Sequence, residues 1–77
     1  MAISTMSEDK NRLIDETLKT VFEALEEKGY KPIPQILGYL FTDDLTYITP
    51  HKKARDLLKE LDRDDIGMRI LEVYFAD

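Results

Sequence analysis

The chain has 77 residues, of which 43% are apolar, and it carries a net charge of −5 with no cysteine and one histidine. This length allows one small domain with a thin core, and the missing cysteines exclude disulfides as a means of stabilising it. The acidic balance opposes general binding to nucleic acid or anionic lipid, and no apolar run approaches the roughly 18 residues needed to cross a bilayer. With no signal-peptide pattern at the start, these features predict a cytoplasmic protein without a cofactor, in which oligomerisation is the remaining way to add buried surface.

Residues 1–7 are short and polar without a helical period, so we expect a flexible N-terminal tail followed by one helical domain over residues 8–77. Ser7 is placed to cap a helix whose first turn holds Glu8 and Asp9. Apolar residues then recur at helical spacing and predict one buried stripe: Ile14, Leu18, Val21, Phe22 and Leu25. The helix is predicted to end at Lys28, with Gly29 as its left-handed terminator.

A second helix is predicted to begin between Pro32 and Pro34 and to run to about Thr42, because proline fits the first turn of a helix. Its apolar side consists of Ile33, Ile36, Leu37, Leu40 and Phe41. Gly38 weakens the interior of this helix. That glycine indicates either a close approach by another backbone or a residue that is merely tolerated.

Asp43 and Asp44 open a connection to a third helix, for which Thr49 is the expected cap and Pro50 the first residue. The apolar stripe of this helix is Ala54, Leu57, Leu58 and Leu61. An aspartate within residues 62–65 is then placed to cap a fourth helix that reaches Phe75.

The fourth helix is apolar on two sides. One stripe contains Ile66, Ile70, Val73 and Tyr74, and the other contains Met68, Leu71 and Phe75. A four-helix chain of this size can scarcely bury both sides alone, so we predict an all-α fold, a compact bundle of about four short helices, that forms a homodimer. Met68, Leu71 and Phe75 are the candidate dimer-interface residues. A terminal strand over residues 69–75 is the alternative interpretation.

Groups that carry out catalysis or bind metals are scarce. There is no Gly-rich phosphate loop, and His51, in the first turn of a helix, is interpreted as an exposed polar residue. Asp43 and Asp44 are interpreted as turn formers, and the aspartates of residues 62–65 as helix-capping groups, in preference to cation ligands. We therefore predict no catalytic residue and no metal site.

A cluster of basic residues gives the third helix a local excess of positive charge: Lys52, Lys53, Arg55 and Lys59. Since the first turn of a helix also directs backbone donors outward, this cluster is the candidate surface for an anionic partner, with a merely solvated face as the alternative. Hydroxyl groups also lie in the expected tail, at Ser4, Thr5 and Ser7, where a kinase can reach them without unfolding the domain.

Several spaced motifs resemble the IreB family, small cytosolic proteins of Gram-positive bacteria. The matching runs are Glu27-Lys28-Gly29-Tyr30-Lys31-Pro32-Ile33, Gln35-Ile36-Leu37-Gly38-Tyr39-Leu40, Thr46-Tyr47-Ile48, Ala54-Arg55, Glu16-Thr17-Leu18 and Arg63-Asp64-Asp65. Together they span about residues 15–75. The nearest match to the family's tail threonine motif is Thr5 followed by Met6.

The resemblance implies a compact helical homodimer without enzymatic activity, whose tail threonines accept phosphate from a membrane Ser/Thr kinase and release it to a matching phosphatase. It also implies a regulatory role in cell-envelope stress and antibiotic tolerance. The leading hypothesis is thus a signalling adaptor phosphorylated at Thr5. A nucleic-acid-binding protein that uses the basic third helix is the alternative from another class, and a small enzyme lacks a nucleophile and base to support it.

Overall fold

The structure is a computed structural model that describes residues 8–76, and every element within this range is helical. The elements are α1 (Glu8–Glu27), α2 (Pro32–Thr42), the 3₁₀ turns η1 (Leu45–Tyr47) and η2 (His51–Lys53), α3 (Ala54–Lys59) and α4 (Arg63–Tyr74). The predicted all-α class is confirmed. The alternative strand over residues 69–75 is wrong, since α4 continues to Tyr74. The expected tail and the Ser7 cap lie outside the described residues.

The long helix α1 ends at Glu27, one residue before the predicted end at Lys28, and Gly29 is the left-handed residue that the sequence predicts. Gly29 adopts a φ of 84°, and the Tyr30 amide donates to the Leu25 carbonyl at 2.9 Å. This pairing satisfies a carbonyl that the helix end would leave open. The chain then turns at once into α2, which begins at Pro32 with proline in its first turn.

Helix α2 has the predicted bounds. Gly38 is closely approached by another part of the chain, which agrees with the first of the two interpretations of this glycine. The neighbour is the side chain of Tyr47 in η1, however, and not another backbone: a Cβ at position 38 would lie 2.5 Å from the Tyr47 ring. Gln35 reinforces this contact by donating from Nε2 to the Tyr47 carbonyl at 2.8 Å. Glycine is therefore needed here because the Tyr47 ring occupies the space that a Cβ at position 38 would fill.

The predicted third helix is divided. The Thr49 hydroxyl does accept from the His51 amide at 3.2 Å, but Pro50, the predicted first helical residue, occupies the N-cap position of η2. Yet Lys52 and Lys53 both adopt left-handed backbone conformations, with φ of 57° and 59°, so that the α-helical segment α3 begins only at Ala54. Contacts from α1 hold this turn: Glu27 accepts from Lys52 Nζ at 2.8 Å and lies 2.7 Å from His51 Nε2.

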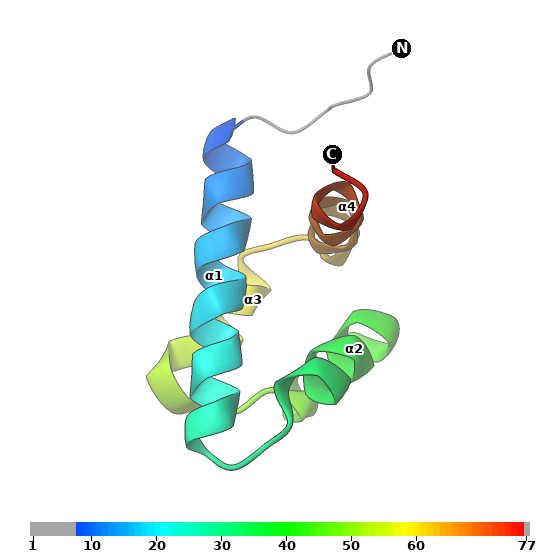
Figure 1. The fold of residues 1–77 in the computed structure, drawn as a ribbon. Coiled ribbons are helices and arrows are strands. Elements are labelled where there is room, and N and C mark those ends of the chain that lie inside the picture. The colour runs from blue at the N-terminus through cyan, green and yellow to red at the C-terminus, as the bar shows by residue number, and fades with distance from the viewer. Residues whose placement is uncertain (1–7, 77) are drawn as a thin grey trace.

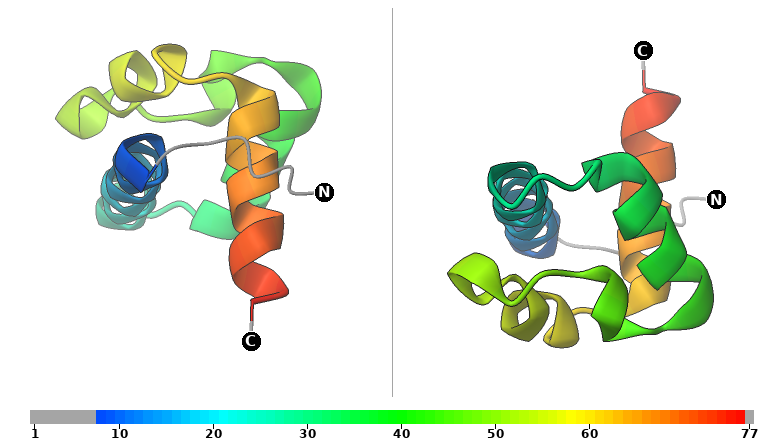
Figure 2. Two further views of the ribbon diagram at one scale, coloured as in Figure 1. Left: turned by 90° about the horizontal axis from the view of Figure 1, so that it is seen from above. Right: turned by 90° about the horizontal axis from the view of Figure 1, so that it is seen from below.

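Helix α4 starts where predicted, with Asp62 at the N-cap position, although the Asp62 side chain makes no capping hydrogen bond. Figure 1 shows α3 behind α1, with α2 and α4 to the right of α1. In the views of Figure 2, α1 is seen end-on while α4 is seen along its length, so α4 runs crosswise to α1.

The core lies between α1 and the segment from η1 to the start of α4. Its fully buried large side chains are Ile14, Val21, Leu25, Ile48, Leu58 and Ile66. The predicted stripe of α1 is thus mostly confirmed, but Phe22 remains 37% exposed and Leu18 is only partly buried. None of the five apolar residues predicted for the second helix is fully buried, and Tyr39 is the one buried residue of α2.

Candidate functional site

An apolar face covers the side of the molecule formed by α2 and α4. Helix α2 contributes Ile33, Leu37 and Phe41, spaced by four residues and therefore on one side of the helix, with Phe41 79% exposed. Helix α4 adds the candidate interface residues, which are exposed by 48% at Met68, 57% at Leu71 and 73% at Phe75. We call these six side chains the α2–α4 face.

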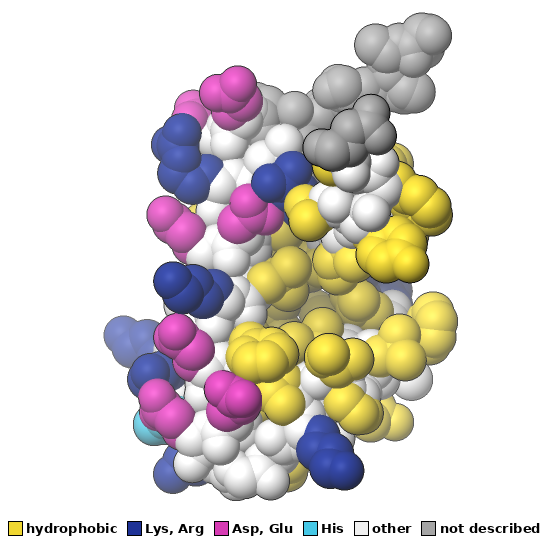
Figure 3. Space-filling model, viewed as in Figure 1, with side chains coloured by type: hydrophobic (Ala, Val, Ile, Leu, Met, Phe, Trp, Pro, Cys, Tyr) yellow, Lys and Arg dark blue, Asp and Glu magenta, His cyan; other side chains and the backbone are white. Residues whose placement is uncertain are grey.

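This face is hollowed. A groove of about 390 Å³ is lined by Leu18 and Phe22 from α1, by Ile33, Ile36, Leu37 and Leu40 from α2, and by Ile70 from α4. A second hollow, of about 590 Å³, continues between α2 and α4 and shares Leu37 and Leu40 with the first. Figure 3 shows the apolar side chains gathered there, while charged side chains cover α1. Contiguous apolar surface of this kind marks an interaction site in a water-soluble protein.

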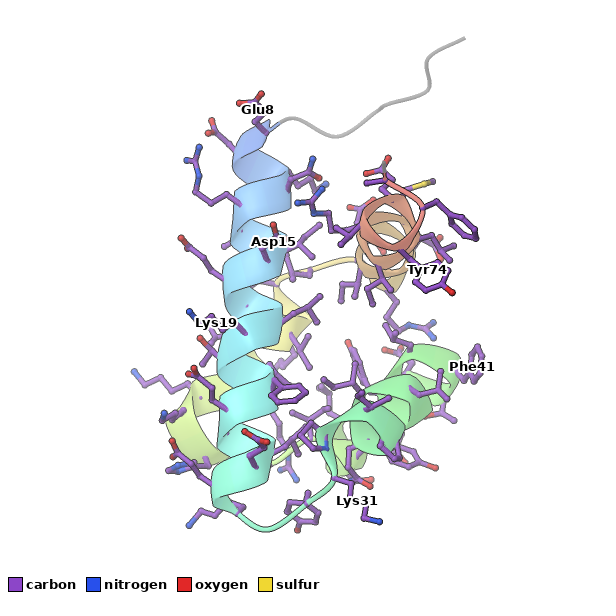
Figure 4. All side chains as sticks on the ribbon, viewed as in Figure 1. Glu8, Asp15, Lys19, Lys31, Phe41 and Tyr74 are labelled. Atoms are coloured by element: carbon purple, nitrogen blue, oxygen red, sulfur yellow. The ribbon has the colours of Figure 1, made fainter. Side chains whose placement is uncertain are left out.

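Two of the side chains labelled in Figure 4 show that this surface points away from α1. Phe41 and Tyr74 both lie on the side of the molecule away from α1, at the outer edges of α2 and α4. Tyr74 is 78% exposed and packs edge-on against Phe75, with the ring centres 5.0 Å apart. Aromatic side chains therefore border the face, and aromatic residues are enriched at protein interfaces.

Ion pairs attach α4 to α1. Asp15 accepts two hydrogen bonds from the Arg69 guanidinium, at 2.8 and 2.7 Å, and Lys10 pairs with Asp65 at 2.7 Å. The hydrogen bonds from Arg69 lower the pKa of Asp15, and the pKa of Lys10 is raised by its hydrogen bond to Asp65. Both shifts mean that the charged forms are favoured in the folded chain.

A further contact joins α4 to the end of α2. Arg63 Nη1 donates to the Leu40 carbonyl at 2.9 Å, and its Nε lies 3.3 Å from Asp43 Oδ1. A guanidinium at the C-terminal end of a helix satisfies open carbonyls and complements the helix dipole. Arg63 therefore fixes the spacing of the two helices that carry the α2–α4 face.

The four basic residues predicted as an anionic-partner surface do not form one unoccupied patch. Lys52 is engaged by Glu27, and Arg55 Nε donates to the Ile48 carbonyl at 2.6 Å. Lys53 and Lys59 are exposed. The pKa of Glu27 is lowered, first by its hydrogen bond to Lys52 and then by the one to His51. His51 is partly buried against Glu27 instead of fully exposed.

The acidic residues considered for cation binding have structural partners. Asp44 Oδ1 accepts from both the amide and the hydroxyl of Thr46, at 2.9 and 2.7 Å, which lowers the pKa of the Asp44 carboxyl. Among residues 8–76, no group of three or more histidine, cysteine, aspartate or glutamate side chains is arranged to hold a metal ion. Thr5, the predicted phosphoacceptor, lies outside the described residues.

The prediction of interface residues from the sequence named residues of α4 alone and left out the exposed apolar residues of α2. Ile33, Leu37 and Phe41 carry a signal that was available: they repeat every fourth residue, while Ile36 and Leu40 form a second apolar row beside them. Helix α2 is thus apolar on two sides, which is the same pattern that identified α4.

Small size, an all-helical fold over residues 8–76 and an exposed apolar face are typical of small helical proteins that bind other proteins. Comparison with known families assigns the particular family: the model of the IreB regulatory phosphoprotein family matches residues 1–76. The chain therefore belongs to the IreB family and is a regulatory phosphoprotein. Within residues 8–76, no helix combines the length and the apolar character required to cross a membrane.

Proposed function

We propose that this chain is a homodimeric, non-enzymatic adaptor of the cytoplasm, and that the α2–α4 face is the surface through which two copies pair. The observation that carries the proposal is the exposure of Leu37, Phe41 and Leu71 beside an apolar groove and a second hollow that adjoins it. A second copy brings an identical apolar face, so both copies remove the same kind of surface from water by one symmetric contact.

The regulatory input is phosphorylation at Thr5. A membrane Ser/Thr kinase transfers the γ-phosphoryl group of ATP to the Thr5 hydroxyl oxygen, the hydroxyl proton leaves, and ADP is released; a phosphatase hydrolyses the ester. The phosphate adds nearly two negative charges and three acceptor oxygens to the start of the chain. The family assignment supports phosphorylation, and the resemblance described above supports a role in cell-envelope stress and antibiotic tolerance.

Phosphorylation is tested by incubating the purified chain with a membrane Ser/Thr kinase and ATP and mapping the product by mass spectrometry. We expect one phosphate within residues 1–7 and none in a Thr5→Ala variant. Phosphate confined to residues 8–77, or its absence from all peptides, would reject phosphorylation of the tail.

Nucleic-acid binding through α3 gains no support from the geometry, because Lys52 and Arg55 are already engaged within the chain. Binding to a random duplex at physiological salt remains the direct test of that alternative.

A further inference from the structure

Helix α4 has apolar residues on two opposite sides, and the α2–α4 face uses only one of them. Met68, Leu71 and Phe75 share one side because they are spaced by three and four residues. Ile70 and Val73 lie on the other side of the helix and are 39% and 55% exposed. The proposed pairing of two copies therefore does not account for the second apolar side of α4.

This second side lines a hollow of about 610 Å³ between α1 and α4. The apolar side chains of its lining are Leu18 and Phe22 from α1 and Ile70 and Val73 from α4. It shares three of them with the groove beside α2, whereas Val73 lines neither of the other two hollows. We call it the α1–α4 hollow, and none of the six side chains of the α2–α4 face belongs to its lining.

The charged side chains around the α1–α4 hollow are acidic in excess. They are Asp15, Lys19, Glu23 and Glu26 from α1 and Arg69 from α4. Asp15 and Arg69 neutralise each other through two hydrogen bonds. Glu23 and Glu26 form no ion pair with any residue between 8 and 76, so two carboxylates stand against the single ammonium of Lys19. In Figure 3, acidic side chains of α1 border the apolar area.

The length of the hollow fits a short helix. Its lining reaches along α1 from Asp15 to Glu26, which are 11 positions apart and therefore separated by roughly 16 Å, or three helical turns. Amphipathic helices bind apolar grooves through side chains spaced by three and four residues. An apolar lining with a negative border therefore calls for a helix that is apolar on one face and basic beside it.

The charge of the chain argues against a second copy as the occupant of this hollow. The net charge is −5, so another copy is repelled by the negative border. A basic partner instead supplies cations for Glu23 and Glu26, which would be costly to cover without them.

We propose that the α1–α4 hollow binds an amphipathic helix of a partner protein, with lysine or arginine beside its apolar face. The apolar face of that helix covers Phe22, Ile70 and Val73, and its basic side chains pair with Glu23 and Glu26. The charge pairs set the orientation of the helix and speed its association. This goes beyond the pairing of two copies and does not depend on it, because the two surfaces use opposite sides of α4.

The test uses the full chain and a synthetic peptide of about 14 residues, roughly four helical turns, with leucine on one face and lysine on the other. We expect the peptide to shift the amide NMR signals of residues 15–26 and 69–73, with an affinity that falls as the salt concentration rises. A peptide with glutamate in place of each lysine should not bind.

Variants on the two sides of α4 separate this surface from the proposed dimer contact. Val73→Lys should lower the affinity for the peptide at least about tenfold, because it sets an ammonium against the peptide lysines, and should leave the mass of the protein in solution unchanged. Leu71→Lys is the matched control: it should weaken pairing of two copies and retain the peptide. If the chain never pairs but Val73→Lys alone loses the peptide, the dimer proposal fails and this one stands.

The carboxylates are tested by Glu23→Gln combined with Glu26→Gln, which should weaken peptide binding by about three- to tenfold, the range for two exposed ion pairs. The matched control combines Glu16→Gln with Glu60→Gln, which removes the same charge from exposed positions outside all three hollows and should have a smaller effect.

Four results would each overturn the proposal. The first is no binding up to about 1 mM peptide. The second is an equal loss of binding in Val73→Lys and Leu71→Lys, and the third is an equal loss in the two glutamine pairs. The fourth is a change from the dimer to a 9.0 kDa species when the peptide is added, because the peptide would then be displacing a second copy.

Discussion

Around α1 and α3 most apolar side chains are enclosed by their own chain, whereas along α2 and α4 most of them lie on the surface. Ile14, Leu25 and Leu58 have no more than 1% of their surface exposed, while Leu37 and Leu71 are about half exposed. These residues are of the same chemical kind and differ only in what covers them. The difference indicates that one half of the chain supplies the core, and it is the basis for our proposal that the other half supplies a surface for binding.

The two halves also differ in how charges are used. In the enclosed half, Glu27 holds the η2 turn through His51 and Lys52. Between the halves, Asp15 and Arg69 join α1 to α4 and line the α1–α4 hollow of about 610 Å³ between these two helices. Charge therefore shapes a turn in the first case and positions a whole helix in the second.

The largest effect is expected from truncation in the enclosed half. Leu58→Ala removes a fully buried side chain and should lower the free energy of unfolding by about 2–5 kcal/mol. Leu71→Ala on the exposed face should change the free energy of unfolding of the single chain by less than about 0.5 kcal/mol. Urea unfolding of both variants at low protein concentration measures the contrast, and equal losses would remove the distinction between the halves.

A charge on the exposed face should act on association instead of folding. Leu71→Glu places a carboxylate in the proposed contact and should weaken dimerisation at least tenfold, which is about 1.4 kcal/mol. Leu13→Glu is the matched control, because Leu13 is 49% exposed on α1 and lines neither of the grooves beside α2. Sedimentation at several concentrations reports the effect, and equal weakening by both variants would argue against this face.

A substitution at Gly38 tests the contact between the Tyr47 ring of η1 and helix α2. Gly38→Ala places a methyl group against the Tyr47 ring and should lower the free energy of unfolding by about 1 kcal/mol. In a Tyr47→Ala background the same change should raise it by about 0.5–1 kcal/mol, because alanine favours the helix and the ring is gone. Thermal or urea unfolding of the unsubstituted chain, the two single variants and the double variant measures these changes. A loss of stability from Gly38→Ala in both backgrounds would contradict the role of the Tyr47 ring in requiring glycine at position 38.

The smallest effect concerns pH. The folded-state pKa of Asp15 lies below its ordinary value of 3.8, so the folded chain binds fewer protons there than the unfolded chain. The contribution of the Asp15–Arg69 pair is present above pH 3.8 and disappears as the pH falls through the lowered pKa. Asp15→Asn should make the acid-induced loss of stability shallower, as followed by urea unfolding over a pH series. If the free energy of unfolding falls with pH equally steeply in the variant and in the unsubstituted chain, the Asp15–Arg69 pair adds nothing to the pH dependence of stability.

Much of the fold could be predicted because local signals agree with the packing. Gly29 supplies the positive φ that ends α1, and Pro32 opens α2. The division before α3 could not be predicted, since lysine has no preference for the left-handed backbone that Lys52 and Lys53 adopt. Glu27 on α1 holds that turn, and such a tertiary contact leaves no local trace in the sequence.

The candidate site could be predicted in part for the same reason. The double apolar pattern of α4 pointed to Met68, Leu71 and Phe75, which are exposed. The role of α2 was missed because a stripe of apolar residues reads the same whether it faces a core or solvent. Only the position of α2 at the edge of the molecule shows that Ile33 and Phe41 face outward.

The central claim is that a second copy covers the α2–α4 face, and the mass of the protein in solution tests it most directly. The chain has a mass of 9.0 kDa, so sedimentation equilibrium should give twice 9.0 kDa, about 18 kDa, at micromolar concentration. A species of 9.0 kDa at every concentration tested would contradict the claim.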